Sequence, residues 1–97
     1  EPNKISYNID FDYYIDKDNE TLVNIIKSNI DKTIQEFINW QKEKIGKDIN
    51  PDELTKRLKI AGVKRVVLRS PAFQKLDFNQ IGINNGVTSN YQGVEEL

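Results

Sequence analysis

The chain has 97 residues, which suits one ordinary small domain and leaves little room for a second. Its 14 basic and 15 acidic residues give a net charge of −1, a balance that argues against wholesale binding to nucleic acid or to an acidic membrane surface. Cysteine and histidine are both absent, which excludes disulfides, thiolate or imidazole metal sites, and histidine-dependent nucleophiles. No apolar run approaches the roughly 20 residues of a membrane span. We therefore expect a single domain over residues 1–97, and its start at Glu1 suggests a fragment of a longer protein.

Residues 5–15 alternate between apolar and polar side chains, which predicts a strand with one buried and one solvated face. The apolar face holds six residues: Ile5, Tyr7, Ile9, Phe11, Tyr13 and Ile15. The other face holds Ser6, Asn8, Asp10, Asp12 and Tyr14.

Residues 16–20 form a polar turn, in which Asp18 or Asn19 is expected to cap a long helix over residues 21–44. Spacings of three and four predict one apolar stripe along this helix. The stripe comprises Leu22, Ile25, Ile26, Ile30, Ile34, Phe37, Ile38 and Ile45. Trp40 lies on its flank, and Gly46 is expected to end the helix.

Residues 51–61 read as a second, short helix that packs through Leu54, Leu58 and Ala61. Asn50 is a good N-cap, Pro51 suits the first helical position, and Glu53 can complete a capping box. Gly62 ends this helix, because glycine adopts the left-handed conformation at little steric cost.

A β-branched run over residues 63–68 predicts the next strand, which Pro71 closes. Val66 and Leu68 are expected to face the helices, which leaves Arg65, Val67 and Arg69 on the other face. The signals then weaken: residues 75–78 look extended, Asn85-Gly86 signals a turn, and residues 87–91 alternate as a final strand.

The expected fold class is therefore α+β, a two-layer sandwich with the order β-α-α-β-β. The long and the short helix pack on one face of a small three-stranded sheet, because this arrangement buries every apolar stripe.

Two acidic groupings could carry chemistry. Asp10 and Asp12 are paired carboxylates, as in a glycosidase, but they lie on a solvated strand face in a domain too small for a deep groove. Asp16, Asp18 and Glu20 resemble the start of a calcium loop, but Thr21 stands where glycine is needed and Lys27 where glutamate is needed. The sequence therefore predicts no enzyme, no metal site and no cofactor.

A basic run extends from Lys56 to Lys75 without an acidic residue, whereas the first twenty residues hold six acidic residues against two basic ones. The run comprises Lys56, Arg57, Lys59, Lys64, Arg65, Arg69 and Lys75. One reading is a nucleic-acid-binding module, which this run would serve by contacting phosphates. The favoured reading is charge pairing, either between neighbouring subunits or within the chain, where Asp10 and Asp12 would meet Arg65 and Arg69.

Three stretches in order carry a family resemblance: the turn GKDI over residues 46–49, the capped helix that follows, and GVKRVVLRSP over residues 62–71. With the preceding strand and acidic turn and the tail LDFNQI over residues 76–81, they resemble the C-terminal domain of baseplate J-like proteins of contractile-tail phages. The likeness extends from Ile5 to Gly93.

The resemblance implies a structural, non-catalytic module in the baseplate wedge of a phage, a phage-like bacteriocin or a related injection machine. Its implied partners are other baseplate and tail proteins and neighbouring copies of the parent protein, without a small-molecule substrate. Its implied location is the bacterial host cytoplasm during assembly and then the tail of the particle. We expect the contacts to involve the exposed face with Tyr14, Arg65, Val67 and Arg69, and Trp40 as a further exposed candidate.

Overall fold

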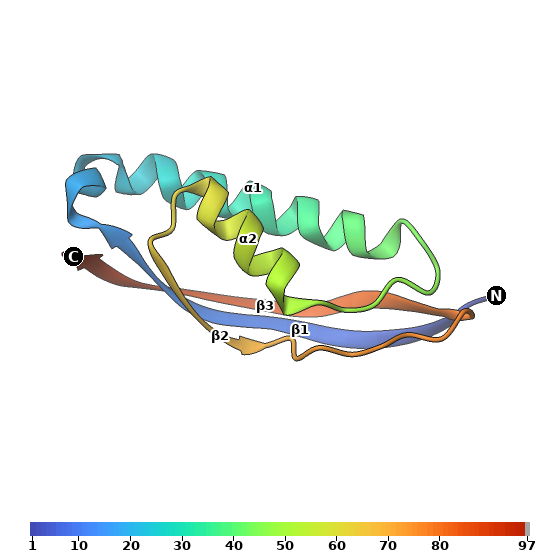
Figure 1. Ribbon diagram of the computed structural model, residues 1–97. Coiled ribbons are helices and arrows are strands. Elements are labelled where there is room, and N and C mark those ends of the chain that lie inside the picture. The colour runs from blue at the N-terminus through green and yellow to red at the C-terminus, as the bar shows by residue number, and fades with distance from the viewer. Residues whose placement is uncertain (97) are drawn as a thin grey trace.

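The computed structural model describes residues 1–96, which form a two-layer α+β fold with both helices on the same face of a sheet (Figure 1). The molecule is elongated, with principal extents of 47 × 19 × 18 Å. Its elements in order are β1 (Asn3–Asp16), the 3₁₀ helix η1 (Lys17–Leu22), α1 (Val23–Lys42), α2 (Pro51–Ala61), β2 (Arg65–Ser70) and β3 (Gln80–Glu95). The predicted fold class and element order are confirmed.

The first strand is the centre of the sheet, whose spatial order is β2-β1-β3. β2 pairs antiparallel to β1, with Tyr14 opposite Arg65 and Phe11 opposite Leu68. β3 pairs parallel to β1 over almost its whole length, from Asn3 opposite Gln80 to Asp16 opposite Glu95. Both edges of the sheet are therefore built from the C-terminal third of the chain.

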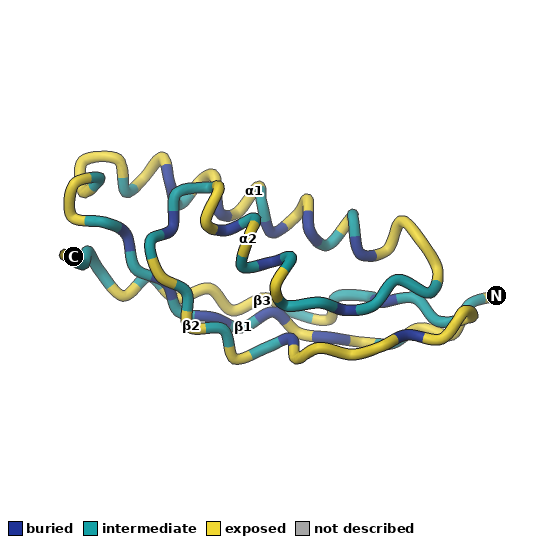
Figure 2. The backbone as a smooth tube through the Cα atoms, viewed as in Figure 1, coloured by how far each residue is buried: buried dark blue, intermediate teal, exposed yellow. Residues whose placement is uncertain are grey.

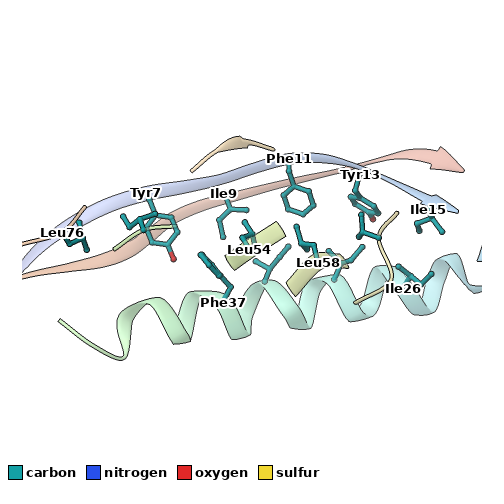
Figure 3. Close-up of a cluster of buried hydrophobic side chains, with 14 residues drawn as sticks. Tyr7, Ile9, Phe11, Tyr13, Ile15, Ile26, Phe37, Leu54, Leu58 and Leu76 are labelled. Carbon is teal, nitrogen blue, oxygen red and sulfur yellow. The ribbon is translucent and has the colours of Figure 1, made fainter. Parts of the chain in front are cut away.

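The core lies between the helices and the apolar face of β1, whose side chains point toward α1 and α2 (Figure 3). Phe11 and Ile15 are fully buried, and the helices contribute Phe37, Leu54 and Leu58, also fully buried, to the same core. The predicted alternation of β1 is confirmed; Ile5, near the start of the strand, is only partly buried.

The predicted stripe of α1 is correct in its middle and wrong at its ends. Ile26, Ile30, Ile34 and Phe37 are buried, but Leu22, Ile25 and Ile45 are exposed, Ile25 to 61%. The buried stripe continues instead to Gln41, four residues after Phe37. The helix ends at Lys42, before the expected Gly46, which lies in the following turn with φ +82°.

The acidic stretch before α1 forms η1 rather than a simple turn. Asp16 caps it by accepting a hydrogen bond from the backbone N–H of Asp18 (2.9 Å). Asp18 and Asn19 lie inside this 3₁₀ helix, and Leu22 precedes α1 without a side-chain cap, so the predicted capping by Asp18 or Asn19 is wrong.

The second helix has the predicted bounds, because both of its ends are set by local signals. The Asn50 side chain accepts a hydrogen bond from the N–H of Asp52 (3.0 Å), and Gly62 ends the helix at φ +121°. The capping box is wrong: the Glu53 carboxylate accepts from Arg57 Nε (2.7 Å) on the next turn of the helix.

The C-terminal third differs most from expectation. Residues 75–78 form no strand; this connection makes a single bridge, between Gln74 and Ile49. The last strand is much longer than the predicted residues 87–91, and Asn85-Gly86 lies within it. Tyr7 pairs with Asn84 and Asn8 with Gly86, so Asn85 is the extra residue of a β-bulge rather than part of a turn.

Candidate interaction surface

The face of the sheet opposite the helices is left uncovered, and we call it the outer face. In Figure 2, β1 alternates between buried and less buried positions along most of its length, and β2 alternates between exposed and partly buried positions. The outer face of β1 carries Asp10, Asp12 and Tyr14, and that of β2 carries Arg65, Val67 and Arg69. All four predicted interface residues (Tyr14, Arg65, Val67 and Arg69) thus share one surface.

Arg69 binds two aspartate side chains on this face. Its guanidinium donates to both carboxylate oxygens of Asp10 (2.8 and 3.2 Å) and to Oδ1 of Asp12 (2.8 Å). The same Asp12 oxygen accepts from Asn90 Nδ2 of β3 at 3.1 Å. One chain of hydrogen bonds therefore crosses all three strands.

Arg65 makes a second group at the other end of β2. It donates two hydrogen bonds to the carboxylate of Glu95 (2.7 and 3.0 Å), although β2 and β3 lie on opposite sides of β1. Its guanidinium also lies 4.0 Å from the centre of the Tyr14 ring, a cation–π contact. The Lys64 ammonium lies 3.8 Å from Glu95 as well. These contacts fix the arginine above the central strand.

The ion pairs hold the carboxylates ionised. Hydrogen bonds from Arg69 lower the pKa of Asp10, and hydrogen bonds from Arg69 and then Asn90 lower the pKa of Asp12 to about 2. The hydrogen bonds from Arg65 likewise lower the pKa of Glu95. A glycosidase acid needs a raised pKa, so the arrangement of Asp10 and Asp12 opposes that reading of the pair.

Val67 lies between the two arginines along β2 and is 39% exposed, opposite Asp12 in the sheet. The outer face thus offers an apolar centre with an ordered guanidinium on either side. Sequence reasoning missed Glu95 and Asn90 as partners here. Asn90 fell in the expected last strand without a role, and Glu95 lay beyond the predicted end of that strand.

Trp40 does not belong to this surface. It is partly buried against the core, with its ring centre 5.8 Å from that of Phe37. The Lys47 ammonium and the Arg57 guanidinium lie over the indole at 3.9 and 5.0 Å. The tryptophan therefore packs α1 against the following turn and α2, on the helical side of the molecule.

The basic run from Lys56 to Lys75 is largely paired within the chain. Four of its seven members form ion pairs: Arg57 with Glu53, Lys64 and Arg65 with Glu95, and Arg69 with Asp10 and Asp12. The prediction that Asp10 and Asp12 lie next to Arg69 is confirmed. Arg65 is joined instead to Glu95.

The acidic turn lines a shallow hollow with Asp16, Lys17, Asp18, Glu20 and Glu96. Lys17 lies within it and approaches Glu20 at 3.8 Å. Across residues 1–96, no three aspartate or glutamate side chains gather closely enough to hold a metal ion. In the same residues, neither α-helix is long and apolar enough to cross a membrane.

Comparison with known sequences adds the family. The family described as Baseplate J-like protein C-terminal domain matches residues 7–90, most of the chain and all or part of every strand and helix. The chain belongs to this family. No curated protein sequence matches the chain. The baseplate J-like family gives the chain a structural role in the baseplate of a phage tail, and a structural family of this kind indicates a non-enzymatic role.

Proposed function

We propose that this baseplate J-like domain is an assembly module of the baseplate wedge and makes its protein–protein contacts through the outer face of the sheet. Its partners would be other tail proteins and neighbouring copies of the parent protein, joined in the host cytoplasm and then carried in the particle. We further propose that residues 1–97 act as one domain within a longer protein.

The observation that supports this proposal is the ordered character of the outer face. Arg65 and Arg69 are held by Glu95, Asp10 and Asp12 before any partner arrives. Binding therefore costs less side-chain entropy than it would with free arginines. Each guanidinium has five N–H donors, so N–H groups remain for a partner's carbonyl or carboxylate oxygens.

The residue types support the same surface. Arginine and tyrosine are enriched among the residues that contribute most to binding energy, and apolar side chains at the centre of an interface exclude water. Val67 lies between two such arginines, with Tyr14 beneath one of them. We expect Val67 to occupy the centre of the contact.

The test compares two exposed apolar positions in opposite layers. Val67→Glu places a charge on the outer face, whereas Ile60→Glu changes a 77% exposed residue of α2 on the helical side. In the parent protein, co-purification with the other tail proteins should fall by roughly tenfold for Val67→Glu and stay unchanged for Ile60→Glu. Circular dichroism checks that both variants fold. Equal binding by Val67→Glu and the unmodified protein would refute the outer face as the contact.

The alternative function, nucleic-acid binding through Lys56 to Lys75, has less support. Most of its charge is balanced within the chain, which reduces the attraction to phosphates. Filter binding to duplex and single-stranded DNA at two salt concentrations tests it. Tight binding that weakens steeply with salt would favour the alternative over the assembly role.

A further inference from the structure

The free edge of β3 is the largest unpaired strand edge in residues 1–96. β3 spans 16 residues and pairs only with β1, so its other edge presents backbone N–H and C=O groups along most of its length. The Gln80 carbonyl is an exception, because it accepts a hydrogen bond from the Gly46 N–H. Such an edge is a template for another strand, and proteins usually protect it with lysine, proline, bulges or a short strand.

The two sheet edges are protected to very different degrees. β2 has six residues, carries Arg65 and Arg69, and is followed by Pro71. β3 contains no proline and no charge before Glu95. Of the two edges, β3 is therefore the one whose own side chains, up to Val94, bring no charge to an added strand; the nearest charge from the helical layer is the Lys27 ammonium, 4.5 Å from the Tyr91 ring centre.

Two bulges limit where that strand can pair. The pairing of β3 with β1 shifts at Asn85 and again between Tyr91 and Val94, near Gly93 with its φ of +122°. Between them, residues 86–91 follow β1 without interruption, from Gly86 opposite Asn8 to Tyr91 opposite Tyr13. This regular stretch of six residues, GVTSNY, is the part of the edge suited to regular pairing.

The side chains of this stretch suit a second copy of itself. Val87 is 42% exposed on the helix-facing side, where its neighbour Ile9 on β1 is buried. Tyr91 lies on the same side and packs against Tyr13 with ring centres 5.5 Å apart. An antiparallel pair centred on Ser89 sets Val87 of one copy opposite Tyr91 of the other. β-Branched and aromatic side chains make favourable cross-strand pairs.

We propose that two copies of this chain associate through antiparallel pairing of their β3 edges, centred on Ser89. The two-fold axis is perpendicular to the sheet, so the paired sheets have six strands and all four helices cover one face. Thr88 meets Asn90 of the second copy on the outer face, and the outer faces of both copies stay open. The proposal rests on the assembly role proposed above, for which it names one partner.

Cysteine crosslinking tests the pairing directly, because the chain has no cysteine of its own. In Ser89→Cys the two thiols meet at the two-fold axis, where the Cα–Cα separation of about 4.5–5.5 Å in an antiparallel pair permits a disulfide. Ile60→Cys, at a 77% exposed position of α2 on the helical side, is the matched control. Under mild oxidation the Ser89→Cys dimer should form much faster than the control dimer. Equal rates would overturn the proposal.

A charge exchange tests the register. Ser89→Lys alone and Ser89→Glu alone each place like charges opposite one another, so sedimentation should show dimer dissociation constants up to roughly fivefold higher. An equimolar mixture pairs lysine with glutamate and should restore association. A monomer from micromolar to millimolar concentration, or a dimer indifferent to both changes, would refute the β3 pairing.

The two proposals fail separately. If Ser89→Lys still co-purifies with the tail proteins while Val67→Glu does not, and the chain stays monomeric, only the β3 pairing is refuted. If the chain dimerises through Ser89 but Val67→Glu binds the tail proteins normally, the pairing stands and the outer-face contact is refuted.

Discussion

The guanidinium of Arg69 on β2 donates two hydrogen bonds, of 2.8 and 3.2 Å, to the carboxylate of Asp10 on the neighbouring strand β1. A third bond from the same guanidinium reaches Asp12. Two aspartates that would otherwise repel each other on one strand face are thereby bridged by one side chain from the neighbouring strand, which offsets half of their charge.

Stability should therefore depend on pH in acid. The folded-state pKa values of Asp10, Asp12 and Glu95 lie below their unfolded values, so the stability from these groups is present above pH of about 4. It is lost as the pH falls toward about 2, the folded pKa of Asp12. Urea unfolding should show the free energy of unfolding decreasing over this window.

The variant Arg69→Gln should make the free energy of unfolding depend less on pH in acid. It removes the hydrogen bonds that lower the pKa of both aspartates, so the unfolding midpoint should be lower at neutral pH and decline less toward pH of about 2. Lys56→Gln, which removes an exposed charge outside the ion pairs of residues 1–96, should keep the original slope. An unchanged slope in Arg69→Gln would contradict this account.

Two glycines with nearly the same φ offer a matched test of the turn after α2. Gly62 (φ +121°) would place a new Cβ 3.1 Å from Ile26 Cγ1, whereas a Cβ on Gly93 (φ +122°) meets nothing within 4 Å. Gly93→Ala should cost about 1–3 kcal/mol of unfolding free energy from backbone strain. Gly62→Ala should cost roughly 1 kcal/mol more from the contact with Ile26. Urea denaturation measures both losses of unfolding free energy. Equal losses would show that the Ile26 side chain moves away from the new methyl group at no cost.

The buried side chain of Gln41 ties the end of α1 to the following turn. Its Nε2 donates to the backbone carbonyls of Lys47 (3.0 Å) and Asp48 (3.3 Å). Gln41→Leu should cost about 1–3 kcal/mol of unfolding free energy, because both carbonyls lose this donor.

Gln41→Glu should be more harmful at neutral pH than Gln41→Leu, since it sets a buried carboxylate against the same two carbonyl oxygens. Burial raises the pKa of such a carboxyl, so protonation on acidification restores a donor and recovers part of the stability. Denaturation of both variants at pH of about 7 and about 5 checks this. A Gln41→Glu variant insensitive to pH would show that the site is solvated.

Ile25 and Ile30 on α1 provide a further pair of positions to compare. Ile30 is 1% exposed and Ile25 is 61% exposed, although the sequence places both in one apolar stripe. Ile30→Ala should cost about 2–5 kcal/mol, while Ile25→Ala should stay within about 0.5 kcal/mol. Thermal unfolding of the two variants distinguishes them, and a comparable loss in Ile25→Ala would indicate that this residue is covered in solution.

Elements with local signals were predictable from the sequence. The bounds of α2 follow from Asn50, Pro51 and Gly62, whose conformations depend on their neighbours in the chain. β1 was predictable in the same way, because its apolar and polar side chains alternate. The apolar ones face the helices and the polar ones face the open side of the sheet. The pairing of β1 with β2 then brought Asp10 and Asp12 to Arg69, which the sequence also predicted.

Elements that depend on distant partners were not predictable. Asn85-Gly86 is a good turn signal, but both residues lie within β3. Because β3 pairs in parallel with β1 on either side of Asn85, this residue forms a β-bulge instead of a turn. β3 lies at an edge with few fully buried residues, so its sequence shows little alternation and its length was underestimated. For the same reason Glu95 was missed as the partner of Arg65. The prediction for the ends of α1 failed for two reasons. Ile25 directly precedes the buried Ile26 and therefore lies on another side of the helix, and Ile45 lies beyond Lys42, where the helix ends.

The parallel pairing of β1 and β3 has a mechanical consequence. The N-terminal end of β1 and the C-terminal end of β3 lie at opposite ends of the molecule (Figure 1). Tension applied between Asn3 and Glu95 therefore acts along the strands and loads the whole β1–β3 ladder in shear, so that its hydrogen bonds must break together rather than one after another. A tail that contracts transmits force through its proteins. In this chain, force between the two ends is carried by the β1–β3 ladder, the longest set of strand pairs in the sheet.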